Sequence, residues 1–139
     1  LQELALEPSG GRRAVVLSVA QFRPEKDHAR QLRAFRMVLD SWSASHALLA
    51  SATGKSAERP TLVIAGAVRH ADDARRLEEL RALADKLFGA TEAERAAVRF
   101  EPNLSFGELR RLFGEAAVGL HTMWNEHFGI GVVELCAAG

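Results

Sequence analysis

Disulfide bonds and a strongly charged surface are both missing from this sequence. Cys136 is the only cysteine, so no internal disulfide can form, and the apolar run around it predicts a buried small side chain rather than a nucleophile. A lone cysteine is typical of a protein in a reducing compartment. The 18 basic residues balance the 18 acidic ones and give a formal net charge of zero. This balance argues against the basic stripe with which proteins grip nucleic acids.

Long apolar segments are also missing. No run approaches the length of a membrane-spanning helix, and no signal-peptide pattern opens the chain, so we expect a soluble domain. The 139 residues, 47% of them hydrophobic, suffice for one core. Residues 1–13 are predicted to be a linker or entry segment and residues 14–139 the domain itself. Because a helix has barely begun at Gly139, we expect the domain to be truncated at its C-terminal end.

Predicted strands and helices alternate along the chain. Apolar runs predict strands at 14–20, 61–65, 97–101 and 117–121, and helical periodicity predicts helices near 29–49, near 72–88 and from 106. Ser105 and Glu108 have the spacing of a capping box ahead of the third helix. This order is typical of an α/β protein whose doubly wound parallel sheet is covered by helices on both faces.

The helix near 29–49 has its apolar residues at helical spacing. Leu32, Phe35, Val38, Leu39 and Trp42 fall on one face, which we expect to lie in the core. Residues 51–60, which follow, are small and polar with glycine and proline among them, and predict a connecting loop.

The most informative block is residues 120–134. A predicted strand ends near His121, residues 122–127 form a loop, and a helix begins around Gly129, so that Glu126 lies in the loop and Glu134 on the helix. The first amides of a helix attract a phosphate, because they lack internal partners and the helix dipole is positive there. Each carboxylate can accept two hydrogen bonds from a sugar diol. The block can therefore hold a sugar nucleotide.

A second polar loop, residues 21–28, follows the first strand. Open parallel sheets bind their ligands at the carboxyl ends of the strands. If the first and fourth strands are neighbours, Arg23 and Lys26 face the helix amides at Gly129 and Ile130, and a pyrophosphate fits between them. The alternative, that both are solvated loop charges, has equal weight on composition alone.

The other polar and aromatic residues of the block have simpler interpretations. His121, Glu126, His127 and Cys136 include metal-ligand types, but their spacing matches no recognised zinc pattern, so we expect no metal site. A histidine at a strand end is more often a hydrogen-bonded structural residue than an acid or base. Trp124 either stacks on a ligand or packs under the loop.

Several segments resemble the donor-binding half of the GT-B glycosyltransferases of family 4. They are Pro-Glu-Lys at 24–26, the Leu-Val-Ile-Ala-Gly strand ending at Gly66, the Glu-Leu-Arg-Arg-Leu helix at 108–112, and the glutamate pair Glu126 and Glu134. Within that family, residues 21–26 and 119–134 are similar to the eukaryotic GDP-mannose-dependent α-1,2-mannosyltransferases of asparagine-linked glycosylation, which extend a dolichol-linked oligosaccharide. The likeness covers most of the chain from about Ala14 onward.

The resemblance implies roles for the two glutamates and for the phosphate ligands. Glu134 would bond the nucleotide ribose, and Glu126, the catalytic candidate, would contact hydroxyls of the transferred sugar. Lys26 matches the family's pyrophosphate lysine. The usual Gly-Arg before it is replaced by residues 20–21, Ala-Gln, which leaves Arg23 as the expected guanidinium. Backbone amides near residues 128–130, Phe128, Gly129 and Ile130, would meet the distal phosphate or the sugar.

The resemblance also implies an enzyme class. Family members transfer the sugar with retention of anomeric configuration and need no metal at the donor site. It implies GDP-mannose as donor, a lipid-linked oligosaccharide acceptor bound by a domain ahead of Leu1, and the cytosolic face of the endoplasmic reticulum as location. We therefore expect donor binding without turnover by this chain alone. Two alternatives remain: a nucleotide-sugar module with another donor or no independent activity, and an interaction domain that binds no nucleotide.

Overall fold

The computed structural model describes residues 12–53 and 57–138 and shows a parallel four-stranded sheet. Its strand order is β3-β2-β1-β4. The strands are β1 (Arg13–Val19), β2 (Thr61–Gly66), β3 (Val98–Pro102) and β4 (Ala116–Gly119). Between and after them come the 3-10 helix η2 (Pro24–Lys26) and the helices α1 (His28–Thr53), α2 (Ala71–Phe88), α3 (Glu92–Arg95), α4 (Phe106–Glu115) and α5 (Ile130–Ala137). The predicted doubly wound α/β architecture is confirmed.

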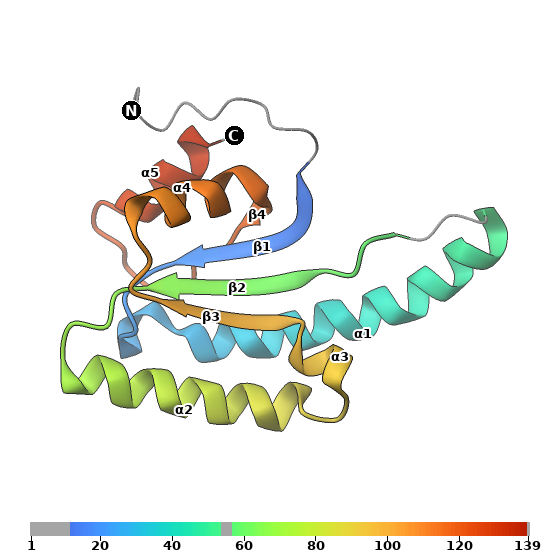
Figure 1. Cartoon of the computed structure of the whole chain (residues 1–139), viewed down its shortest axis with the longest axis horizontal. Coiled ribbons are helices and arrows are strands. Elements are labelled where there is room, and N and C mark those ends of the chain that lie inside the picture. The colour runs from blue at the N-terminus through green and yellow to red at the C-terminus, as the bar shows by residue number, and fades with distance from the viewer. Residues whose placement is uncertain (1–11, 54–56, 139) are drawn as a thin grey trace.

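Helices cover both faces of the sheet, as Figure 1 shows, with α1 and α2 on one side and α4 and α5 on the other. Strand β2 is buried on both faces because successive side chains of a strand point in opposite directions. Leu62 and Ile64 pack with α1 and α2, whereas Val63 and Ala65 pack in the second cluster, with α4. The chain thus has two apolar layers, one on each side of the sheet.

Strands β1 and β4 are neighbours, as the predicted ligand site requires. Their pairing brings Val16 opposite Val118 and Leu17 opposite Gly119, with an irregularity in register near Arg13. The ladder continues one residue past β4, where the Leu120 N–H donates to the Leu17 carbonyl at 2.8 Å. The loops that follow β1 and β4 therefore leave the same edge of the sheet side by side.

Helix α1 differs from its prediction in length and in burial. It continues to Thr53, because the segment 47–53 contains no glycine or proline, so the predicted loop 51–60 begins within the helix; residues 54–56 lie outside the described residues. Leu32, Phe35 and Leu39 are buried, but Val38 is 46% exposed. Val38 and Trp42 instead line an open apolar groove on the outer side of α1, so their assignment to the core is wrong. Helical spacing identified the apolar side of α1, yet no described element covers all of it.

The two ends of the domain also differ from expectation. Strand β1 begins at Arg13, within the predicted linker, whose residues 1–11 lie outside the described part of the chain. Cys136 is exposed rather than buried. The reason is the placement of α5, which turns Leu135 toward the sheet and has no fully buried residue. The capping box of Ser105 and Glu108 is confirmed.

Candidate functional site

A cavity of about 450 Å³ lies at the carboxyl edge of the sheet, between the ends of β1 and β2 and the start of α5. Such an edge is where open α/β sheets bind ligands. Its lining is mostly apolar and backbone-rich on the sheet side and charged on the loop side. The lining residues are Val19, Ala20, Gln21, Lys26, Ala65, Gly66, Ala67, Leu104, Leu109, His121, Glu126, Gly129, Ile130, Gly131 and Glu134.

Two glycines allow the backbone segments around the cavity to approach closely. A Cβ atom at Gly66 would lie 2.0 Å from the carbonyl oxygen of Ala20, and one at Gly131 would lie 3.0 Å from that of Val19. The first contact is impossible for a side chain and the second is tight. The ends of β1 and β2 and the first turn of α5 are therefore held together by backbone packing.

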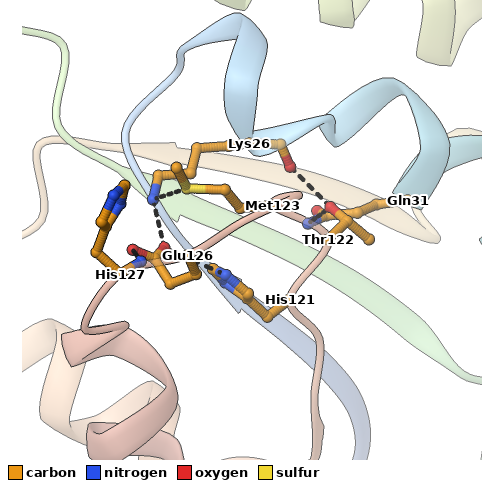
Figure 2. A network of polar contacts seen from close by, with 7 residues as sticks. All are labelled: Lys26, Gln31, His121, Thr122, Met123, Glu126 and His127. Atoms are coloured by element: carbon orange, nitrogen blue, oxygen red, sulfur yellow. Dashed lines mark hydrogen bonds and ion pairs between the residues drawn. The ribbon is translucent and has the colours of Figure 1, made fainter.

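Lys26 and Glu126 form the charged centre of the cavity (Figure 2). The Lys26 Nζ donates to Glu126 Oε2 at 2.8 Å and to Met123 Sδ at 2.9 Å. The Lys26 hydrogen bond, more than the other neighbouring groups, lowers the pKa of Glu126. Glu126 is therefore an ionised, acceptor-only carboxylate at neutral pH, which is the state needed to bind hydroxyls.

His121 lies on the other side of the same carboxylate. Its Nε2 is 3.3 Å from Glu126 Oε2, but the pair does not have hydrogen-bond geometry, so it becomes an ion pair only when the imidazole is protonated. The backbone N–H of His127 donates to Glu126 Oε1 at 3.2 Å. Glu126 is thus oriented by its own loop as well as by Lys26.

A half-buried threonine joins the two loops. The Thr122 hydroxyl donates to the Lys26 carbonyl at 2.7 Å and accepts a hydrogen bond from Gln31 Nε2 at 2.9 Å (Figure 2). Gln31 is itself buried on α1. Because these bonds join the loop after β4 to the loop after β1, they fix the position of Lys26 relative to Glu126.

The N-terminus of α5 opens toward the cavity without a side-chain cap. Gly129, the N-cap, has the left-handed conformation φ 65°, ψ 50°, which favours glycine. Its carbonyl accepts the N–H groups of Val132 and Val133, at 2.8 and 3.1 Å, and no acidic residue stands in the first turn. The first amides of α5 and the helix dipole can therefore act on an anion. Glu134 lines the same cavity from the next turn.

The structure brings together five of the seven predicted site residues. Lys26, Glu126, Gly129, Ile130 and Glu134 all line the cavity. The two that do not are Arg23, which lines a second cavity of about 510 Å³, and Phe128, whose side chain is 76% exposed. The prediction that Arg23 faces the α5 amides together with Lys26 is therefore not met, because the chain turns between Gln21 and Arg23. Phe128 was predicted through its backbone amide, and no contact tests that.

Sequence reasoning missed Gln21 and the apolar pair Leu104 and Leu109, which also line the cavity. Gln21 could have been found, because it is the first polar residue after the first strand. The leucines had no signal beyond ordinary core residues. Trp124 is 89% exposed, so it does not pack under its loop.

Metal-ligand clusters and membrane-spanning helices are both absent from residues 12–53 and 57–138. Over this part of the chain, no group of three or more His, Cys, Asp or Glu side chains is placed to hold a metal ion. None of the helices described there combines the length and the hydropathy that crossing a bilayer requires.

Sequence comparisons connect this site to known proteins. Residues 7–139 match the family model described as glycosyl transferases group 1. The chain is 46% identical over 125 residues to a mouse protein named GDP-Man:Man(3)GlcNAc(2)-PP-Dol alpha-1,2-mannosyltransferase, and 44% identical over 128 residues to the human protein of that name. These matches cover 90% of this chain but 22% of either relative, so the chain spans about a fifth of their length.

Solved structures show the same fold at low sequence identity. An E. coli trehalose-6-phosphate structure bound with UDP-2-fluoro glucose has a TM-score of 0.74 and 14% identity, over 99% of this chain and 32% of that one. The alpha,alpha-trehalose 6-phosphate synthase of Burkholderia multivorans has a TM-score of 0.69 and 19% identity, over 93% of this chain and 26% of that one. The fold is that of the GT-B glycosyltransferases, as predicted.

Proposed function

Because the chain belongs to the family of glycosyl transferases group 1, we propose that it is the donor-binding part of a GDP-mannose-dependent α-1,2-mannosyltransferase that extends a dolichol-linked oligosaccharide. The observation that carries this proposal is the convergence of Lys26, Glu126, Glu134 and the uncapped start of α5 on one cavity. The identity to relatives with that printed name supports the choice of donor.

Each part of a sugar nucleotide has a partner in the cavity. The diphosphate would lie between Lys26 and the first amides of α5, where an ammonium group and a positive helix end face one point. Glu134 would accept hydrogen bonds from the ribose. Glu126 would accept them from hydroxyls of the transferred mannose, and it is our catalytic candidate. The base would lie against the apolar side of the cavity, near Leu104 and Leu109.

Lys26 has a second task during transfer. Negative charge grows on the GDP diphosphate as the bond to the sugar breaks, and preorganised cations and amides stabilise such charge. The Lys26 ammonium is bound to Glu126 at 2.8 Å. A bound donor would place the diphosphate on one side of this ammonium and the sugar hydroxyls beside Glu126. Lys26 would then contact the leaving diphosphate directly and the transferred sugar through Glu126.

The remaining parts of the proposal come from the family resemblance. They are transfer with retention, donor binding without a metal ion, action at the cytosolic face of the endoplasmic reticulum, and binding of the lipid-linked acceptor by a domain ahead of Leu1. From these we expect that the 139-residue chain binds donor without turnover. Unchanged GDP-mannose affinity in EDTA would support metal-free binding. Mannose transfer to a lipid-linked acceptor by this chain alone would contradict the assignment of acceptor binding to another domain.

The proposal is tested by calorimetric titration of the chain with GDP, GDP-mannose, UDP-glucose and NAD. We expect the guanosine ligands to bind best and to bind more weakly to Lys26→Ala and Glu134→Ala, by about tenfold or more, since each variant loses a charge-assisted contact. Lys86→Ala, on the exposed side of α2, is the matched control and should bind like the parent. A folded chain that binds none of the four ligands, or binds NAD best, would contradict the proposal.

A further inference from the structure

Gln21, rather than the expected Arg23, lines the cavity with Lys26. It comes two residues after the end of β1, at a point where the start of α5 also lines the cavity. The preceding residue is fixed by the sheet, because the Ala20 N–H donates to the Ala65 carbonyl at 3.0 Å. The Gln21 side chain is half-buried. A neutral carboxamide, with two N–H donors, therefore stands where the diphosphate is proposed to lie.

A tight turn separates Gln21 from Arg23. The Arg23 N–H donates to the Gln21 carbonyl at 2.8 Å, and the residue between them, Phe22, is completely buried. With Phe22 anchored in the core, Gln21 lines the first cavity and Arg23 the second.

Arg23 is engaged by a carboxylate on α2. Its Nε lies 3.8 Å from Asp73 Oδ1, and the Asp73 side chain is only 5% exposed. The other oxygen of Asp73 accepts the backbone N–H of Arg69 at 2.9 Å. Asp73 is therefore a fixed partner, and leaving it unpaired would be costly. The Arg23 carbonyl in turn accepts the Lys26 N–H at 3.2 Å, so the same residue begins the turn that presents Lys26.

We propose that Gln21 donates a hydrogen bond to the donor diphosphate beside Lys26, and that Arg23 is a positioning residue that holds the Lys26 turn against α2 through Asp73. This inference rests on the proposed donor site. Lys26 is then the only lysine or arginine among the described residues that line the cavity. With one cation instead of two on the diphosphate, GDP is bound less tightly, which favours its release after transfer.

The test is calorimetric titration of the 139-residue chain with GDP, with thermal unfolding of every variant to confirm folding. We expect Gln21→Ala to weaken GDP binding about tenfold, the loss of one hydrogen bond to a charged group. Gln21→Arg should strengthen it by about as much, because it adds a second cation. Arg23→Ala should weaken GDP binding when Lys26 is present. In a chain that already contains Lys26→Ala, titrated at millimolar GDP, it should have no further effect. Arg23→Lys, which keeps a cation opposite Asp73, should bind GDP like the parent.

Two results would overturn this inference alone. One is parent-like GDP binding by Gln21→Ala. The other is an Arg23→Ala effect of the same size with and without Lys26, which would make Arg23 an independent ligand rather than a residue acting through Lys26. A parent chain that binds no GDP, or that binds it equally well as Lys26→Ala, would overturn the proposed function and this inference with it.

Discussion

The N-termini of α2 and α5 lie at the same edge of the sheet, yet only one is left open. Helix α2 has Asp72 and Asp73 in its first turn, and the Asp73 carboxylate accepts the backbone N–H of Arg69. That carboxylate offsets the positive end of the α2 dipole. Helix α5 begins at Gly129 with no side-chain cap and no acidic residue in its first turn. The positive N-terminal end of α2 is therefore balanced by carboxylates of the protein. The N-terminal end of α5 has no such carboxylate and can bind the anionic group of a ligand.

At the start of three other described helices, a side chain also accepts a backbone N–H group. The Asp27 side chain accepts the Arg30 N–H ahead of α1, Thr91 accepts the Glu94 N–H for α3, and Ser105 accepts the Glu108 N–H for α4. A helix N-terminus is thus not a binding site by itself. Helix α2 also lacks a side-chain cap at its N-cap residue, His70, but has acidic residues in its first turn. Helix α5 has neither a cap nor a first-turn acid, and this combination, next to Lys26, distinguishes the site.

The largest effect is expected when α5 is given the carboxylate that α2 already has. In Ile130→Asp an acidic side chain stands in the first turn of α5, at a position that lines the cavity and is 59% exposed. We expect GDP affinity to fall on the order of a hundredfold, because like charges a few Å apart repel strongly in a partly dehydrated site. Calorimetry with GDP measures it.

The matched control is Ile130→Asn, which has the same shape without the charge. Its affinity should stay within about threefold of the parent, since the loss of exposed apolar surface matters little. Melting temperatures should show that neither variant unfolds. Equal losses in Ile130→Asp and Ile130→Asn would contradict an open anion site at α5.

A second, slightly smaller effect concerns His28, which interacts with one cation from each cavity, Lys26 of the first and Arg76 of the second. Its imidazole is completely buried and neither ring nitrogen has a hydrogen-bond partner. Burial, with the nearby cations Arg76 and Lys26, lowers the pKa of His28 from 6.5 to about 4. The unfolded chain therefore binds this proton at higher pH than the folded chain does. The neutral imidazole is tolerated above pH 6.5, and stability is lost as the pH falls from 6.5 toward 4.

Urea unfolding at pH 7.5 and pH 4.5 measures this loss. We expect His28 to account for roughly 2 to 3 kcal/mol of the free energy of unfolding lost between these two values. His28→Met, which fills a similar volume without a titrating group, should lose that much less than the parent over the same interval. A variant with the parent's full pH dependence would show that the loss comes from carboxylates elsewhere.

Sequence reasoning identified the charged centre of the site but not its outline. Glu126, Glu134 and Lys26 could be predicted because they stand in loops or helix starts that follow strands, where topology fixes their place. Arg23 could not, because one turn around the buried Phe22 decides which cavity it lines.

The apolar residues show a similar division. Periodicity indicates which side of a helix is apolar, but not whether another element covers it. Leu39 is buried and Val38 is exposed because part of the apolar side of α1 faces away from the sheet and α2. The same reason explains Cys136, which stands beside Leu135 on α5 but points away from the sheet.

A third prediction separates the sugar end of the α5 site from its phosphate end. Glu126 is ionised and faces Lys26, so it is available to mannose hydroxyls. In Glu126→Ala, the preference for GDP-mannose over GDP should disappear, a loss of about tenfold, which is the lower end of the contribution of one hydrogen bond to a charged group. Competition calorimetry with both ligands measures the ratio, and an unchanged preference would place the sugar away from Glu126.

The smallest effect is expected at α4, whose N-terminus is closed by its own side chains. The Ser105 hydroxyl accepts the Glu108 N–H, and the Glu108 carboxylate accepts the Ser105 N–H at 2.8 Å. Ser105→Ala should cost about 1 kcal/mol of unfolding free energy, the usual contribution of an N-cap. It should leave GDP affinity unchanged, because no ligand takes the place of the lost cap. If GDP instead stabilised this variant more than the parent, the start of α4 would also bind an anion, and the contrast between open and closed helix ends would not identify the site.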